Sequence, residues 1–262
     1  MNMAYLYYPG CTLKTKAKEL DSFALNSMKA LGIDFKEFDD WQCCGAVYPQ
    51  AKDELATRLS AVRALDAAKK EQRSLLTLCS ACHHVIKRVN HDMRTDSDIR
   101  NKVNNYLSLE TPYCGETTLV HYIEMLRDTV GFNELKKHVS KPLTGRKIGA
   151  YYGCLLLRPS DIMQFDDPEN PSVIEDFISA IGAEPVVFSY RNECCGGYVA
   201  LDDEKLVQGL CENIMISVSH KGADSLITAC PLCKYNLAKN SGNNALPIYY
   251  FTELLAEALD VK

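Results

Sequence analysis

Short apolar runs alternate along the chain with longer segments whose apolar residues recur at helical spacing. In the segment 53–73, Leu55, Leu59, Val62 and Leu65 fall on one face, which is typical of an amphipathic helix. The apolar runs of the first half predict strands at 4–8, 34–38 and 74–78, with helices at 16–31 and 53–73 between them. The second half repeats this order, with predicted strands at 147–152, 185–188 and 225–228 and predicted helices at 172–181 and 205–221.

A fourth strand-then-helix unit is expected in each half, at 119–126 and 248–255. Aligning these two units places His121 opposite Tyr250 and Glu124 opposite Glu253. Strands that alternate with helices indicate a parallel sheet with helices on its faces. The sequence therefore predicts an α/β fold of two related domains, 1–142 and 143–262, each a small parallel sheet flanked by helices.

Length and composition fit this division. The chain has 262 residues, more than a typical single domain, and its 47% hydrophobic content is enough to form a core. A net charge of −5 argues against nucleic-acid binding, because a phosphate backbone needs a basic face. We expect a cytoplasmic protein without a membrane span, since the sequence shows neither an export signal nor about 18 consecutive apolar residues.

Ten of the 12 cysteines form two copies of one pattern. In each copy a single cysteine is followed by a Cys-Cys pair, which glycine follows directly, and 34 residues separate this pair from a Cys-x-x-Cys motif. Every cysteine group comes just after a predicted strand, and ligands bind at the carboxyl ends of strands in such sheets. We therefore expect the cysteine loops to gather five thiolates into one pocket in each half.

The number five narrows the chemistry of these pockets. A disulfide framework is disfavoured, because such frameworks belong mainly to small secreted domains. A structural zinc site takes four protein ligands, and an ordinary [2Fe–2S] or [4Fe–4S] cluster is held by four cysteines. Adjacent thiolates also repel one another, which a multi-iron centre offsets better than one divalent ion. Zinc in one domain remains an alternative, whereas a purely structural zinc protein leaves the fifth thiol of each set unexplained.

This pattern resembles the cysteine-rich CCG domain family and, within it, the B subunit of heterodisulfide reductase. The resemblance rests on Cys43-Cys44-Gly45 and Cys194-Cys195-Gly196 with their flanking cysteines, and it covers nearly the whole chain. It implies two noncubane [4Fe–4S] clusters, one for each motif. The implied ligands of the first cluster are Cys11, Cys43, Cys44, Cys79 and Cys82. Those of the second cluster are Cys154, Cys194, Cys195, Cys230 and Cys233.

The resemblance also implies an activity, that of a disulfide reductase within a multi-subunit complex. The disulfide of coenzyme M and coenzyme B, or a related disulfide, would be cleaved between the two clusters. Each thiolate product would be captured by an iron of a different cluster, so that no side chain is assigned a catalytic role. Candidates for protonating the products are His83, His84, His121 and Glu124.

Electrons for this reaction must come from partners, because the sequence shows no glycine motif for a nucleotide cofactor and no ferredoxin motif. The resemblance implies a ferredoxin-like iron–sulfur subunit and a flavin-bearing subunit, which larger complexes couple to a hydrogenase or formate dehydrogenase, as in methanogenesis. The alternative is a different class of protein. Similar CCG modules occur in iron–sulfur electron-transfer subunits of respiratory dehydrogenases for lactate, glycolate, glycerol phosphate or succinate.

Other residues lie near the cysteine motifs in sequence. A substrate with sulfonate, carboxylate or phosphate groups would need cations, and the candidates are Lys14, Lys16, Arg158 and Arg191. Cys114 and Cys211 stand outside the repeat and are expected to be buried free thiols. Cys154 and Cys194 are separated by eight more residues than Cys11 and Cys43, and 166–171 is the expected insertion.

Overall fold

The computed structural model describes residues 4–46, 53–242 and 246–261. They form two parallel four-stranded sheets, with strand orders β2-β1-β3-β4 and β6-β5-β7-β8. The strands are β1 (Tyr5–Tyr8), β2 (Phe35–Glu37), β3 (Ser74–Thr77), β4 (Leu119–His121), β5 (Lys147–Tyr151), β6 (Glu184–Val186), β7 (Ser225–Thr228) and β8 (Ile248–Tyr250). The predicted α/β class and the repeated parallel sheet are confirmed.

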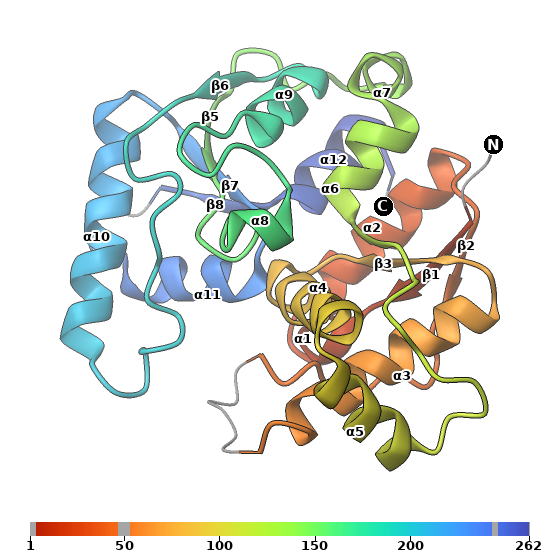
Figure 1. Ribbon diagram of the computed structural model, residues 1–262. Helices are drawn as coiled ribbons and strands as arrows, with labels where there is room; N and C mark the ends of the chain where they lie inside the picture. Colours follow the sequence, from red (N-terminus) through yellow and green to blue (C-terminus); the bar gives the residue numbers. More distant parts are fainter. Residues whose placement is uncertain (1–3, 47–52, 243–245, 262) are drawn as a thin grey trace.

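Helices cover both sheets (Figure 1). They are α1 (Gly10–Thr15), α2 (Lys18–Ala30), α3 (Ala56–Lys70), α4 (Ser80–Thr95), α5 (Ser97–Leu107), α6 (Tyr122–Met125), the π-helix η1 (Leu126–Val130), α7 (Phe132–His138), α8 (Ser160–Met163), α9 (Val173–Ala180), α10 (Glu204–His220), α11 (Pro231–Asn240) and α12 (Phe251–Leu259). The expected helix 16–31 begins later, as α2 at Lys18, because Ala17 lies outside the helical region of the backbone (φ −130°, ψ 43°). The sequence analysis did not predict α4, α5 and α11. None of the helices in the described ranges is long and apolar enough to cross a membrane.

The strand order brings the cysteine groups to one edge of each sheet. In the first sheet, β1 lies between β2 and β3, and Tyr7 is in register with Glu37 and Leu76. Because all strands are parallel, the loops that follow β1, β2 and β3 leave the sheet at the same edge. These loops carry the three cysteine groups of the first half. The second sheet repeats the arrangement with β5 between β6 and β7.

In the fourth strand-then-helix unit of each half, the same capping motif joins the strand to its helix. His121 at the end of β4 and Tyr250 at the end of β8 are helix N-cap residues, and each forms a capping box with the glutamate three positions on, Glu124 and Glu253. In a capping box, the N-cap side chain and the glutamate side chain each accept a hydrogen bond from a backbone N–H that has no partner within the helix. The expected pairing of His121 with Tyr250 and of Glu124 with Glu253 is confirmed.

The two halves are interlocked. Helix α12 of the second half packs on α2 of the first half, and Figure 1 shows the two side by side. The Thr252 hydroxyl on α12 donates to the Leu20 carbonyl at 3.0 Å. A second contact between the halves is made by α7 of the first half and α9 of the second half, where the Phe132 and Phe177 rings meet. One hydrophobic core therefore runs through both halves, and the division at residues 142 and 143 stays a prediction.

Candidate metal centre

The cysteines of the first set come together at the edge of the first sheet. The Sγ atoms of Cys11 and Cys43 are 3.4 Å apart, and those of Cys44 and Cys82 are 3.3 Å apart. Cys79, the N-cap residue of α4, interacts with Cys82 one turn further along the helix. The five residues that the resemblance assigns to one cluster form a single group of sulfur atoms.

The second set repeats this geometry at the edge of the second sheet. The Sγ atoms of Cys195 and Cys233 are 3.5 Å apart. Cys154 hydrogen-bonds with Cys194, and Cys230 with Cys233. The second set reaches the surface at Cys194, which is its exposed member. Both copies of the sequence pattern therefore produce a set of five neighbouring thiols.

The two sets face each other across the junction of the halves. Cys79 of the first set and Cys230 of the second set lie close enough for each thiol to shift the pKa of the other. Beside them, the Ser80 hydroxyl donates to the Ala229 carbonyl at 2.7 Å. The Tyr250 hydroxyl lies 2.6 Å from the Leu78 carbonyl and 3.2 Å from that of Ala229, which ties the two Cys-x-x-Cys loops together.

Glycine is required in the loops that carry the sulfur atoms. Gly10 and Gly153 precede the first cysteine of each set and have φ of +73° and +63°. A Cβ at Gly10 would lie 3.0 Å from the Cys82 sulfur. Only glycine adopts such a backbone without strain while leaving the sulfur uncovered.

A buried tyrosine anchors each Cys-Cys loop. Tyr8 and Tyr151 lie three residues before the first cysteine of their sets. Their hydroxyls donate to the carbonyls of Gln42 and Glu193, which are the residues just before the two Cys-Cys motifs. The sequence analysis missed these tyrosines, although the repeated Tyr-x-Gly-Cys spacing at 8–11 and 151–154 was a usable signal.

Hydrogen bonds among the thiols create thiolates within each set. Bonds from Cys43 and Cys82 lower the pKa of Cys44 to about 4. The bond from Cys154 lowers the pKa of Cys194 to about 6, and the bond from Cys233 lowers that of Cys195 to about 7. Each set therefore carries thiolate at neutral pH, which is the form that binds metals.

This donor set fits an iron–sulfur cluster. Soft thiolate ligands select iron–sulfur clusters, zinc and copper(I) over magnesium or calcium. Within the described part of the chain, no three cysteine, histidine or acidic side chains surround a position for one ion. Five cysteines in each set are one more than the four protein ligands that a structural zinc ion takes.

The four candidate cations have different surroundings. Lys14 pairs with Asp21 at 2.8 Å and with Glu37 at 2.6 Å. Arg191 is buried, with its Nε 3.4 Å from Glu175 and its Nη2 donating to Asn170 at 2.7 Å. Arg158 donates to the Asn192 carbonyl at 3.0 Å and pairs with Glu169 at 3.3 Å. Lys16 lines a cavity beside the first thiol set. Substrate contact by these cations stays a prediction, and only Lys16 lies in that cavity.

The cavity beside the first thiol set is built from both halves and has a volume of about 1040 Å³. All five cysteines of the first set line it, together with residues of α1 and α2. Its other wall comes from the second half, from α11 and Glu253. The sequence analysis did not predict that the second half completes a cavity at the first set.

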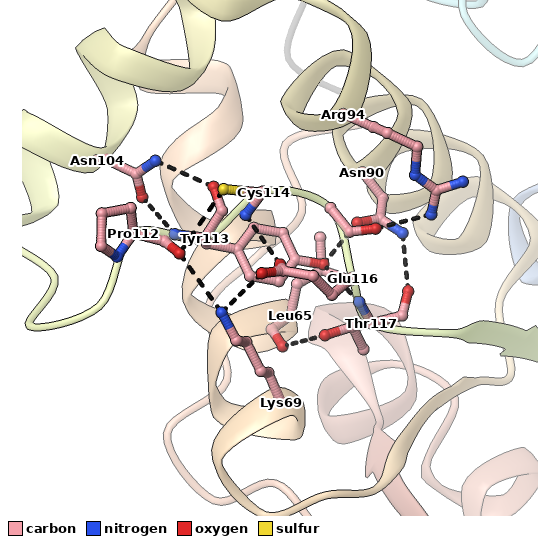
Figure 2. Close-up of polar contacts among 11 residues, drawn as sticks. Leu65, Lys69, Asn90, Arg94, Asn104, Pro112, Tyr113, Cys114, Glu116 and Thr117 are labelled. Carbon is pink, nitrogen blue, oxygen red and sulfur yellow. Dashed lines mark hydrogen bonds and ion pairs between the residues drawn. The ribbon is translucent and has the colours of Figure 1, made fainter.

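The two cysteines outside the sets differ from each other. Cys211 is buried on α10, as expected, and its thiol donates to the Cys195 carbonyl at 3.4 Å. The expectation that Cys114 is buried was wrong, because it is exposed. Figure 2 shows the reason, since the buried Tyr113 is held by Asn104 and Asn90 and the chain turns outward at the next residue.

Two histidines lie buried beneath the junction. His83 is fully buried, with Nδ1 2.9 Å from the Thr77 hydroxyl and Nε2 3.6 Å from Glu124. His121 donates from Nε2 to the Leu78 carbonyl at 3.1 Å, and desolvation lowers its pKa to about 3. Burial keeps both imidazoles neutral at pH 7. Both form hydrogen bonds with residues that directly precede Cys79.

This burial predicts a loss of stability in acid. His121 has a folded-state pKa of about 3 and an unfolded-state pKa near 6.5, so the unfolded chain binds the proton first as pH falls. Stability therefore decreases from about pH 6.5 downward. Between about pH 7 and pH 5.5, urea unfolding should show the wild type losing about 1 kcal/mol more than His121→Gln. Equal losses in the two proteins would contradict the buried neutral histidine.

Tyr198 is a site residue that the sequence analysis did not identify. It lies in the loop after the second Cys-Cys-Gly motif, and its side chain is partly exposed. Burial is the largest cause that raises the pKa of Tyr198. The charges of Cys230, Cys44, Cys154 and other thiols raise it further. Charges on thiols of both sets therefore act on its hydroxyl, which stays protonated. No repeated motif marks this position.

Comparison with known proteins gives the site a context. A family model described as a cysteine-rich (CCG) domain matches residues 5–87 and 148–238, once in each half. Among solved structures, the chain resembles a hypothetical protein from Helicobacter pylori with a TM-score of 0.74 and 14% identity. The match covers 100% of this chain and 50% of that one, and it shows a likeness of fold alone.

Three curated proteins are similar over most of their length. The chain is 29% identical to the 8-methylmenaquinol:fumarate reductase membrane anchor subunit of Wolinella succinogenes, covering 100% of this chain and 94% of that protein. It is 25% identical to the B subunit of the ferredoxin:CoB-CoM heterodisulfide reductase of Methanosarcina mazei, covering 99% and 90%. It is 27% identical to a protein of Archaeoglobus profundus described as like the B subunit of heterodisulfide reductase, covering 96% and 89%.

Proposed function

We propose a function from the premise that this chain belongs to the cysteine-rich CCG domain family: it is an iron–sulfur redox subunit of a multi-subunit oxidoreductase and cleaves a disulfide. Its similarity to subunits of heterodisulfide reductases supports a redox role within a complex. The observation that carries disulfide cleavage is the closeness of Cys79 and Cys230, whose thiols shift each other's pKa across the junction of the two sets. The disulfide bond of a substrate held at this junction would lie beside the cysteines of both thiol sets.

We propose that each thiol set holds one noncubane [4Fe–4S] cluster through its five cysteines, with zinc in one set as the alternative. When bound, two such clusters supply the two electrons that a disulfide needs, one from each. The balanced reaction takes two electrons and two protons and converts one disulfide into two thiols. The substrate is the coenzyme M–coenzyme B disulfide or a related disulfide.

The side chains at the junction would position the substrate. Ser80 and Tyr250 fix the two Cys-x-x-Cys loops relative to each other through the carbonyls of Ala229 and Leu78. Tyr198 keeps its proton beside thiols of both sets and can donate a hydrogen bond to a sulfur atom bound there.

A second function is favoured by one observation, the 29% identity with the Wolinella fumarate reductase subunit over the whole chain. In that case the same two thiol sets would carry electrons between a quinol and a fumarate-reducing partner. No disulfide would be cleaved. This reading corresponds to the electron-transfer alternative that the sequence analysis left open.

For the disulfide reductase, we propose a ferredoxin-like iron–sulfur subunit and a flavin-bearing subunit as partners, with a hydrogenase or formate dehydrogenase in the larger complex. The electron-transfer function would replace these with a quinol-linked complex. The cysteines are all free thiols, which suits a reducing compartment such as the cytoplasm.

The test begins with iron, zinc and acid-labile sulfide in anaerobically purified protein. About eight iron and eight sulfide atoms per chain are expected for two four-iron clusters. EPR of the oxidised protein should then change on addition of coenzyme M, because a thiol binds at the junction. Purified complex should oxidise reduced viologen with the coenzyme M–coenzyme B disulfide. Oxidation of 8-methylmenaquinol without disulfide turnover would favour the second function, and zinc without sulfide would exclude both.

A further inference from the structure

Exposed apolar side chains are concentrated beside the second thiol set. Of the nine large ones among the described residues, four lie within 198–206, the segment that joins the second Cys-Cys-Gly motif to the start of α10. They are Tyr198, Val199, Leu201 and Leu206, which we call the apolar patch. Leu201 is 96% exposed and Leu206 is 50% exposed, so neither side chain belongs to the core. Clustered apolar side chains on a surface mark sites of protein contact.

The apolar patch is held in place by hydrogen bonds. The Val199 N–H donates to the Gly196 carbonyl at 3.0 Å, and the Asp203 N–H donates to the Val199 carbonyl at 3.0 Å. The Asp203 side chain then caps α10 by accepting from the Leu206 N–H at 2.9 Å. A Cβ at Gly196 would lie 3.0 Å from the Leu210 side chain, so the Cys-Cys-Gly turn lies directly against α10. The patch is therefore presented by a hydrogen-bonded turn and the first turn of a helix.

The first half covers its corresponding helix with an additional segment. The Cys-Cys pair and the Cys-x-x-Cys motif are 34 residues apart in both halves, so α3 and α10 correspond residue by residue. Helix α5 packs on α3, and the Thr117 hydroxyl donates to the Leu65 carbonyl at 2.8 Å (Figure 2). In the second half, only residues 241–247 lie between α11 and β8, fewer than the 11 residues of α5 alone. This segment is too short to cover α10 in the same way.

Helix α10 lies at the outer edge of the molecule, and matched positions show the effect of the missing cover (Figure 1). Leu65 of α3 is fully buried, whereas the corresponding Ile216 of α10 is 37% exposed. Leu55 packs against the core, whereas the corresponding Leu206 belongs to the apolar patch. Between them, the exposed Asn213 stands where α3 has a valine. Such a mixture of apolar and polar side chains is typical of a partner that binds and also separates.

The charges around the apolar patch are mainly acidic. Within residues 187–212, Lys205 is the exposed basic residue, because Arg191 is buried against Glu175. An acidic rim attracts a partner with a basic face. It repels a second copy of this chain, because a two-fold contact places the same carboxylates opposite each other. The exposed acidic residues of this rim are Glu193, Asp202, Asp203, Glu204 and Glu212.

The second thiol set comes to the surface at the same place. Cys194 is its exposed member and lies four residues before Tyr198. The charges of thiols act on the Tyr198 hydroxyl, so the apolar patch adjoins the thiols themselves. A partner that covers the patch therefore comes beside the second set. Electron-transfer proteins meet through small interfaces, and four apolar side chains with a charged rim suit that size.

We infer that the apolar patch and its acidic rim are the docking surface of an electron-transfer protein with a basic face. The reduced cofactor of this partner is the electron donor, and it gives one electron per encounter to the centre at the second thiol set. That the partner transfers electrons rests on the proposed function. That a protein docks here rests on the apolar patch, its charges and the missing cover of α10.

The first test is photo-crosslinking in the purified complex. With p-benzoylphenylalanine in place of Leu201, near-UV light should join this chain to a subunit that carries a flavin or an iron–sulfur cluster, identified by mass spectrometry. The same group in place of Tyr106, which is 64% exposed on α5, is the matched control and should not give this product. A crosslink from position 201 to a second copy of this chain or to a subunit without a redox cofactor would overturn the inference. So would the absence of any crosslink.

The second test probes the acidic rim with cytochrome c, a basic electron-transfer protein, by calorimetry at low salt on the full chain with its clusters. Exchange of Asp202 and Glu204 for lysine should weaken binding by about tenfold or more. Exchange of the exposed Glu110 and Glu134 for lysine changes the net charge equally and should weaken binding by less than about threefold. Iron content and melting temperature confirm that both variants are folded. Equal weakening by the two exchanges would show that cytochrome c responds to net charge alone and would overturn the rim.

These outcomes separate the docking surface from the proposed function. If position 201 crosslinks to a redox subunit in a complex that reduces no disulfide, the docking surface stands and disulfide cleavage fails. If the complex reduces a disulfide while position 201 meets no redox subunit, the proposed function stands and the inference fails.

Discussion

Exchange of Cys44 for serine is expected to lower the iron and sulfide content from about eight to about four atoms of each per chain. Cys44 is buried at the centre of the first set, and its pKa of about 4 makes it a thiolate at neutral pH. Serine keeps the shape of the side chain but stays protonated and offers hard oxygen in place of soft sulfur. Colorimetric iron and sulfide assays on anaerobic protein measure the change.

Cys195→Ser in the second set should remove the other half of the iron. Cys114→Ser is the control, because Cys114 is exposed and belongs to neither set. It should retain the full content. Loss of all iron in Cys44→Ser would contradict two independent clusters and indicate one joined centre, for which the closeness of Cys79 and Cys230 gives a structural basis.

Phe251→Ala is expected to lower the free energy of unfolding by about 3–5 kcal/mol. The Phe251 ring is fully buried where the halves meet, with ring centroids 4.9 Å from Tyr250, 5.5 Å from Tyr122 and 6.1 Å from Phe177. Truncation removes this packing and leaves a cavity between elements of both halves. Urea unfolding, followed by far-UV circular dichroism on samples of equal iron content, measures the loss.

Leu201→Ala is the matched control for this truncation. Leu201 is 96% exposed, so its removal should change stability by less than about 0.5 kcal/mol. A loss below about 1 kcal/mol in Phe251→Ala would show that the halves do not depend on this contact.

Most of what the sequence predicted correctly repeats between the halves, although the repeated helices α4 and α11 were not predicted. The strand-then-cysteine units, the parallel order and the pairing of His121 with Tyr250 all follow from comparing one half with the other. Such a comparison shows what the halves share and says nothing of how they pack together. The comparison therefore could not predict that α11 forms a wall of the cavity beside the first thiol set. Helix α11 lies roughly 220 residues from the Cys11 loop in sequence.

Nearness in sequence was also a poor guide to free charges and exposed thiols. Lys14 and Arg191 lie beside cysteine groups, yet the structure pairs Lys14 with Asp21 and Arg191 with Glu175. Residue spacing does not show which carboxylates come close in space. Cys114 is exposed because Asn90 and Asn104 hold Tyr113 inward, a contact among three separate segments.

The packing of α12 on α2 has a consequence for biosynthesis. The hydrogen bond from Thr252 to Leu20 joins residues 232 positions apart, so the first half lacks part of its core until α12 has left the ribosome. During translation the first five thiols are already made while their surroundings are incomplete. Delivery of iron and sulfide to the first set is therefore expected to follow the synthesis of α12.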